Sequence, residues 1–327
     1  MTSQETGRWS VRSAWLGAFA WIAMLGVARI RPIPVGVIEQ LFLLAPLVIV
    51  PLGLRLADMS HRHGHSAGAY AFACRLQPFA AFLLVGSFCL MPGITAALLA
   101  LPWLLVSGLA GYAGCQRLLR GTYRRVEEAC PDVGLLYLTI GAAWLVVSRF
   151  GRSFLGFEEP IVLLTAVHFH YTGFAAPIIT GAVGRMLSHS NSRARPLFRC
   201  LAIGVLAGPP LIAIGFVYSP WIQVVAVLWL SISLAGVSLC ALTLLPRMRH
   251  GAARGFVIIS SFSGLAGMTL AACYAVGEFT GHQWLSIPHM ARTHGVINAL
   301  GFTFCGLIGW VCANPRSNIE AEDVPYT

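Results

Sequence analysis

The chain has 327 residues, of which 57% are hydrophobic and only 10% are charged, and its mean hydropathy is +0.74. A soluble domain carries about 25% charged residues, so this composition excludes a soluble globular fold. Apolar runs of about twenty residues are typical of membrane-spanning helices. The sequence therefore predicts an all-α, polytopic transmembrane helix bundle.

The formal net charge is +10, and all 22 basic residues are arginines. All but one of them lie in short segments beside the apolar runs, where arginine sets membrane orientation and meets anionic lipid headgroups. The predicted partner is thus the lipid bilayer and not a nucleic acid. The nine cysteines are scattered singly without a CxxC pair, which is typical of small core residues and not of a zinc site or a disulfide framework.

Ten apolar runs are long enough to cross a membrane. They lie near residues 13–30, 34–57, 69–91, 93–115, 132–149, 160–186, 197–217, 220–245, 255–277 and 288–313. The third and fourth runs are separated only by Met91, Pro92 and Gly93, but their combined length requires two passes.

Arginine placement orients these runs, because cytoplasmic segments carry the excess of basic residues. With the N-terminus inside, sixteen arginines fall on inward segments and five on outward segments. We therefore expect ten spans with both termini in the cytoplasm. Residues 1–313 form one predicted transmembrane domain, and the polar tail 314–327 is expected to be disordered. The first run also permits a second interpretation as a cleaved signal peptide.

Ionisable residues at membrane depth are costly, and they are functional candidates by default. His168 and His170 lie in the otherwise apolar sixth run. Residues two apart on an α-helix point in roughly opposite directions, so both could face one site only if the helix were distorted. Pro177 predicts such a distortion, because it cannot donate to the carbonyl of Gly173. Each histidine could also serve only as a hydrogen-bonding link between helices.

The tenth run supplies the predicted partner of this region. His294 and Asn298 are four residues apart, so they share one helix face. An asparagine can fix the tautomer of an imidazole, as a catalytic or metal-binding histidine requires. Together with further polar residues near the outer helix ends, these side chains predict a polar pocket open to the extracytoplasmic side. The alternative is a packing contact between helices in which Asn298 only has its hydrogen bonds satisfied.

Three other features are weaker. Glu158 and Glu159 precede the sixth run, where carboxylates favour a helix N-terminus electrostatically, although Glu159 could also carry protons at the pocket mouth. The histidines at 61, 63 and 65 lie in a predicted inward loop and lack the four spaced ligands of a structural zinc site. Arg117 also falls in an inward loop, so its substitution by alanine is expected to have no effect.

Several enzyme and pump motifs are missing from the sequence. It has no P-loop, GxSxG elbow, HExxH helix, CxxCH haem site or dinucleotide fingerprint, which excludes the corresponding motif-defined classes.

The AVHFHYTGF run at 166–174 and the THGVINALGF run at 293–302 resemble the YndJ-like family of bacterial multispanning proteins. The resemblance implies a multi-pass protein of the bacterial cell membrane. It also implies that the family is recognised by His168, His170, Tyr171, Gly173, His294, Gly295 and Asn298. The family is functionally uncharacterised and is sometimes labelled a transporter, so the resemblance supplies no reaction.

The leading hypothesis is a membrane-embedded enzyme that acts on a lipophilic small molecule. His168, His170 and His294 would perform acid/base chemistry or ligate a transition metal, because imidazole suits both roles. Asn298 would orient an imidazole, Tyr171 would supply a hydroxyl, and Glu159 would lie at the mouth. The alternatives are a transporter or proton path that uses the same residues and a structural protein with packing histidines. The sequence indicates no oligomeric state.

Overall fold

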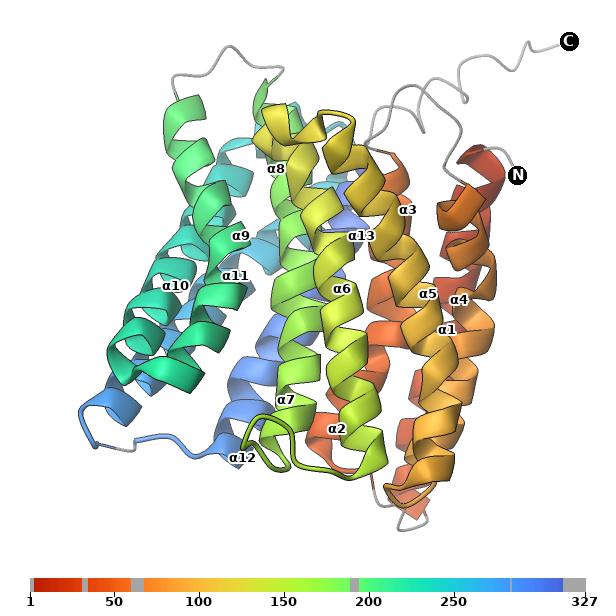
Figure 1. Cartoon of the computed structure of the whole chain (residues 1–327). Helices are drawn as coiled ribbons and strands as arrows, with labels where there is room; N and C mark the ends of the chain where they lie inside the picture. The colour runs from red at the N-terminus through yellow and green to blue at the C-terminus, as the bar shows by residue number, and fades with distance from the viewer. Residues whose placement is uncertain (1–2, 31–34, 60–67, 189–193, 283, 314–327) are drawn as a thin grey trace, which may run out of the picture.

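The computed structural model describes residues 3–30, 35–59, 68–188, 194–282 and 284–313. These residues form an all-helical bundle (Figure 1) with ten helical spans that are long and apolar enough to cross a membrane. The predicted fold class and the ten spans are therefore confirmed. The tail at 314–327 and the histidines at 61, 63 and 65 lie outside the described residues.

Seven spans are single α-helices. They are α1 (Ser3–Ile30), α4 (Gly68–Phe88), α5 (Ile94–Leu119), α6 (Val126–Phe150), α9 (Arg195–Tyr218), α10 (Pro220–Thr243) and α11 (Gly251–Phe279). Two 3₁₀ turns, η2 (Thr122–Arg124) and η4 (Leu245–Arg247), lie in the connections. The turn at Met91–Gly93 separates α4 from α5 as the sequence predicts.

Three spans are interrupted by π-helix, in which the backbone bond runs five residues back instead of four. Span 2 consists of α2 (Val37–Leu44), η1 (Ala45–Ile49) and α3 (Val50–Asp58). Span 6 consists of α7 (Ile161–His168), η3 (Phe169–Ala175) and α8 (Ala176–Ser188). Span 10 consists of α12 (Ile287–Met290), η5 (Ala291–Gly295), η6 (Ile297–Phe304) and α13 (Cys305–Cys312).

The interrupted spans form the centre of the bundle. Spans 2 and 6 are the most buried of the ten, and their segments contact each other and span 10. Helices α1, α4 and α5 lie on one side of this centre, and α9, α10 and α11 lie on the other (Figure 1). The central position explains why these apolar helices carry polar residues, which lipid-facing helices do not tolerate.

Two prolines explain the interruption in span 2. Pro51 has no N–H, and the N–H of Val50 donates five residues back, so the carbonyl of Pro46 is left without a helical donor. Gln77 of α4 donates its Nε2 to this carbonyl at 2.7 Å. Ser13 of α1 donates to Gln77 Oε1 at 2.5 Å, so three spans are joined through one freed backbone group. In a bilayer every such group needs a partner within the protein.

Helix α1 approaches span 2 closely at Gly17. A Cβ atom at this position would lie 1.9 Å from the carbonyl oxygen of Leu47, so only glycine allows this backbone contact. Farther along, Trp21 Nε1 donates to the carbonyl of Gln40 at 2.8 Å. The first span is thus packed into the bundle through its backbone as well as its side chains.

The cytoplasmic placement of both termini stays a prediction from the arginine distribution. Reporter fusions after Thr327 and within residues 186–196 should both give a cytoplasmic signal. An external signal from either fusion would contradict the predicted topology.

Gln77→Leu should lower the free energy of unfolding by about 1 to 3 kcal/mol, because the buried Pro46 carbonyl loses its donor. Thermal melting in detergent measures this change. Gln116→Leu is the matched control, because the Gln116 side chain donates to the exposed Tyr112 hydroxyl and not to a buried carbonyl, so this variant should melt as the wild type. Equal melting of the two variants would contradict the role of Gln77.

Candidate functional site

The π-helical segments of the three central spans meet in the middle of the bundle. Segments η1, η3 and η6 each contact the other two, although they come from distant parts of the sequence. π-Helical insertions occur frequently at functional sites. The candidate motifs of spans 6 and 10 therefore lie in adjacent segments with irregular backbone.

The interruption in span 6 confirms the distortion predicted from Pro177. Because Pro177 cannot donate to Gly173, the bonding pattern shifts, and the N–H of Ala176 donates five residues back to Tyr171. A π-helix turns by about 80° per residue, so residues two apart still point in nearly opposite directions. The distortion therefore does not bring His168 and His170 to one side of the helix.

His170 is fully buried, and both of its ring nitrogens have protein partners. Nδ1 lies 2.7 Å from the carbonyl oxygen of Ala166, which can only accept, so Nδ1 carries the proton. Nε2 accepts from Trp103 Nε1 at 3.0 Å. Phe42 covers the ring edge-on at a centroid distance of 5.0 Å. Neither nitrogen of His170 offers a free lone pair in this arrangement.

The Tyr171 hydroxyl donates to the carbonyl of Leu41 at 2.7 Å. This carbonyl is a second group freed by proline, because Ala45 donates to Phe42 instead and Pro46 has no N–H. Tyr171 is buried, so its hydroxyl replaces a missing helical donor in span 2. The bond fixes η3 against α2.

His168 lies on an accessible face of span 6. Its Nδ1 lies 2.7 Å from the carbonyl oxygen of Leu164, which again places the proton on Nδ1. Apart from Val167, the accessible residues in this half of the span recur at one-face spacing: Ile161, Leu164, Thr165, His168 and Thr172. From Gly173 to Gly184 the span is buried on all sides, so the accessible face belongs only to the half that carries His168.

His294 and Asn298 are in direct contact, as their spacing predicts. The Asn298 Nδ2 atom lies 3.1 Å from His294 Nδ1 and 2.8 Å from the His294 carbonyl oxygen. His294 Nδ1 also lies 2.8 Å from the carbonyl oxygen of Gly267 in α11. Since a carbonyl only accepts, Nδ1 carries a proton and donates to Gly267. The Gly267 carbonyl therefore sets the tautomer, and Asn298 donates to backbone.

Gly267 also explains why the two helices approach so closely here. A Cβ atom on Gly267 would lie 2.5 Å from Asn298 Nδ2. Sequence reasoning missed this residue, because the contact is made by its backbone carbonyl, and every residue has such a group. The Oδ1 atom of Asn298 is buried and has no hydrogen-bond partner among the described residues.

His168 and His294 lie on spans 6 and 10, which contact each other through η3 and η6. The Nε2 atoms of both rings have no hydrogen-bond partner in the described part of the chain. The structure thus distinguishes three histidines: His170 uses both nitrogens within the protein, whereas His168 and His294 each keep one.

Glu159 lies at the exposed start of α7. Its Oε2 accepts from the N–H of Leu163 at 3.2 Å, so the carboxylate satisfies a donor in the first helical turn. Its charge also acts on Arg149, whose guanidinium donates to the carbonyls of Ser87 and Leu90 at 3.0 and 2.7 Å. Both residues are engaged in holding helix ends.

The residues present do not fit the tentative metal set of His168, His170 and His294. Within the described ranges, no three His, Cys, Asp or Glu side chains are grouped to hold a metal ion. The satisfied ring of His170 is the physical reason, because ligation would require breaking its bond to Trp103 or Ala166.

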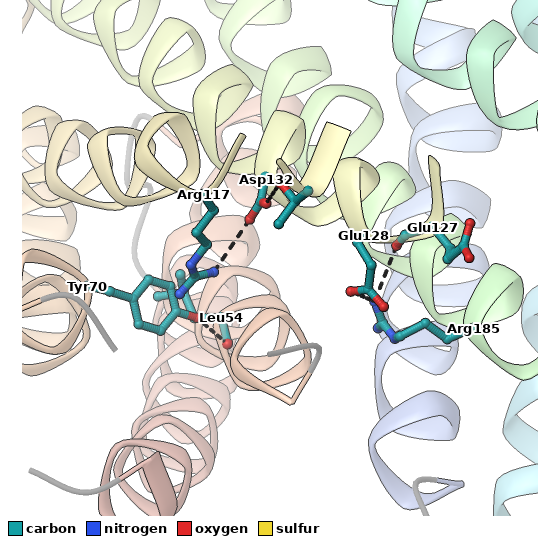
Figure 2. A network of polar contacts seen from close by, with 8 residues as sticks. Leu54, Tyr70, Arg117, Glu127, Glu128, Asp132 and Arg185 are labelled. Atoms are coloured by element: carbon teal, nitrogen blue, oxygen red, sulfur yellow. Dashed lines mark hydrogen bonds and ion pairs between the residues drawn. The ribbon is translucent and has the colours of Figure 1, made fainter. Parts of the chain in front are cut away.

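A second polar cluster lies at the opposite end of the bundle (Figure 2), and sequence reasoning missed it. Asp132 of α6 is fully buried. Its Oδ1 lies 3.6 Å from Arg117 Nη1, and its Oδ2 accepts from Thr122 at 2.7 Å. The Arg117 guanidinium lies 4.5 Å from the ring centroid of Tyr70, whose hydroxyl donates to the Leu54 carbonyl.

The expectation for Arg117 was wrong. It lies within α5 and not in a loop, and it pairs with a buried carboxylate. The missed signal was Asp132, an acidic residue at the start of an apolar run. Arg185 forms a neighbouring link, with Nη1 3.9 Å from Glu128 Oε2 and 3.4 Å from the Glu127 carbonyl (Figure 2).

Comparison with known proteins places this architecture in one family. The YndJ-like protein family matches residues 40–302. The chain is 32% identical over 212 residues to the uncharacterized membrane protein YndJ of Bacillus subtilis (strain 168). The match covers 64% of this chain and 38% of that protein, so the chain spans well under half of the relative's length. No solved structure matches.

Asp132→Leu should lower the free energy of unfolding by about 3 to 5 kcal/mol, because Arg117 is left as an uncompensated buried charge. The double variant Asp132→Leu/Arg117→Met should recover most of this loss, since apolar residues can replace a buried pair. Thermal melting in detergent measures both. Arg120→Met, at the exposed end of the same helix, is the control. A double variant as unstable as the single variant would show that the two residues are not coupled.

Proposed function

This chain belongs to the YndJ-like family of multi-pass membrane proteins, and we propose that it is a membrane-embedded enzyme. In this proposal His168 and His294 exchange protons with a lipophilic substrate. The supporting observation is the pair of imidazoles on adjacent central spans, each held by Nδ1 and each with Nε2 unbonded within the described residues.

The tautomers support an acid/base role. A neutral imidazole with its proton on Nδ1 presents a lone pair on Nε2, which is the form of a general base. Backbone carbonyls of Leu164 and Gly267 hold the two rings in this form. A second imidazole on the contacting span can then return a proton to the substrate, so one histidine acts as base and the other as acid.

The location supports a lipophilic substrate. His168 lies seven residues into span 6 and His294 lies seven residues into span 10, a depth of about 10 Å at 1.5 Å per residue. The neighbouring accessible residues Ile161 and Leu164 are apolar. A molecule that reaches this depth beside such residues has to tolerate hydrocarbon.

The remaining candidate residues have positioning roles in this proposal. His170 and Tyr171 fix η3 through Trp103 and Leu41, and so determine where His168 lies. Asn298 contacts His294 directly. Glu159 caps α7 and leaves a carboxylate at the accessible end of the same helix. The proposed chemistry is proton transfer by imidazole, and no step is assigned to a metal.

A transporter is the second candidate, and the interrupted central helices favour it. In many transporters, discontinuous helices at mid-membrane supply the backbone groups that bind solute and coupling ions. Spans 2, 6 and 10 are all interrupted at their mutual contact. In this alternative His168 and His294 would carry protons along a path and not to a substrate.

His168→Gln and His294→Gln should each reduce turnover by a factor of about 10² to 10⁴, the usual contribution of a positioned general acid or base. Both should stay folded, because an intramembrane hydrogen bond contributes only about 0.6 kcal/mol on average. Lipid extracts of cells that produce each variant, compared by untargeted mass spectrometry, measure turnover without a known substrate. His282→Gln is the control, since His282 is exposed and its ring Nδ1 contacts Thr280 at the end of α11, away from both central histidines.

The outcomes separate the candidates. An enzyme changes the mass of at least one extracted compound, and the two variants abolish that change. A transporter leaves all masses unchanged but alters proton-linked uptake into vesicles. Variants that lose only thermal stability, with unchanged extracts and uptake, would leave the histidines as helix contacts and overturn the proposal.

A further inference from the structure

We infer that the site formed by His168, His294 and Asn298 binds a lipophilic molecule through the ligand's own hydrogen-bond donors, and that it rejects anions. The ligand class is an amphiphile with a hydroxyl or a protonated amine as its polar group. This inference rests on the proposed function, since it concerns the same site, and it follows from counting which donors and acceptors remain free.

Each of the three side chains donates one N–H to a backbone carbonyl, and the second N–H of the Asn298 amide remains at the contact between Nδ2 and His294 Nδ1, which are 3.1 Å apart. Nδ1 of His168 donates to Leu164, and Nδ1 of His294 donates to Gly267. The Asn298 amide donates to the carbonyl of His294 at 2.8 Å. Because all three acceptors are carbonyl oxygens, the nitrogen that faces each of them has to carry the proton.

The orientation of the Asn298 amide follows from the same contacts. The amide end that lies 2.8 Å from the His294 carbonyl oxygen has to be the NH₂ group. An amide oxygen in that place would set two lone pairs against each other. The other end is therefore Oδ1, which is buried without a partner among the described residues.

Three acceptors thus remain at the site: Nε2 of His168, Nε2 of His294 and Oδ1 of Asn298. A buried acceptor without a donor costs about 1 to 3 kcal/mol, and a ligand O–H or N–H relieves this cost. A carboxylate or phosphate offers only lone pairs, so it would lose its hydration without gaining a bond.

The other polar groups near the site do not reverse this balance. Thr165 already donates its hydroxyl to the Ile161 carbonyl at 2.8 Å. Thr172 carries a hydroxyl that can donate or accept. Arg292 is exposed and is two residues from His294, so it points to a nearly opposite side of the helix. The site therefore offers acceptors and one adaptable hydroxyl.

The test uses the full chain in phosphatidylcholine nanodiscs, because this lipid has no hydrogen-bond donor. Diethyl pyrocarbonate modifies imidazoles that have a free nitrogen lone pair, and peptide mass spectrometry reads each histidine separately. We expect His168 and His294 to react and His170 to resist, since its two nitrogens are engaged. Resistance of His168 and His294, or rapid reaction of His170, would overturn the assignment of lone pairs.

Matched ten-carbon probes then identify the ligand class. Decanol and decylammonium should slow modification of His168 and His294 about tenfold, whereas decanoate and decane should not, and His282 should react equally throughout. Asn298→Leu should weaken protection by the best probe about tenfold, since one acceptor is lost. If decanol protects the two histidines more strongly than decylammonium, the ligand carries a hydroxyl; the reverse order indicates an amine.

Equal or better protection by decanoate would overturn the ligand class. That result is separable from failure of the proposed function. Protection by anions combined with inactive His168→Gln and His294→Gln leaves the enzyme proposal intact. Protection by donors combined with fully active variants leaves the binding site intact and removes its catalytic role.

Discussion

Proline removes backbone donors from the centre of this bundle, and the need to replace them organises much of the structure. Inside a bilayer no water can satisfy a carbonyl, so every freed oxygen requires a donor from the protein. Gln77 serves the carbonyl of Pro46, and Tyr171 serves the carbonyl of Leu41. These two bonds hold spans 3 and 6 against span 2, and they bring the irregular segments η1 and η3 together.

The same irregular backbone shapes the candidate site. In span 6, His170 is held by hydrogen bonds to Trp103 and Ala166. His168 points to a different side of the same span and stays accessible. In span 10, the close approach that Gly267 allows puts a carbonyl against the ring of His294. Hydrogen bonds therefore fix His170 and Tyr171 within η3, and the rings of His168 and His294 are each held through Nδ1.

The sequence predicted the features that depend on local pattern. Apolar length located the ten spans, Pro177 located the distortion in span 6, and the spacing of His294 and Asn298 located their contact. It did not predict features that depend on tertiary partners. The role of Asp132 depends on Arg117 from another helix, and the tautomer of His294 depends on a carbonyl in α11. A local pattern cannot show which residue of another helix each side chain meets. Arg117 was placed in a loop because α5 continues past the apolar run to Leu119.

The bond between Tyr171 and Leu41 joins residues 130 positions apart, and this separation has a consequence for biosynthesis. Ribosomes add about 5 to 20 residues per second, so roughly 7 to 26 s pass between synthesis of Leu41 and synthesis of Tyr171. During this interval span 2 has entered the membrane with one carbonyl still lacking its final donor. Until the sixth helix emerges, only a group other than Tyr171 can satisfy this carbonyl. The bond that fixes η3 against α2 therefore forms only once the sixth of the ten spans has been synthesised.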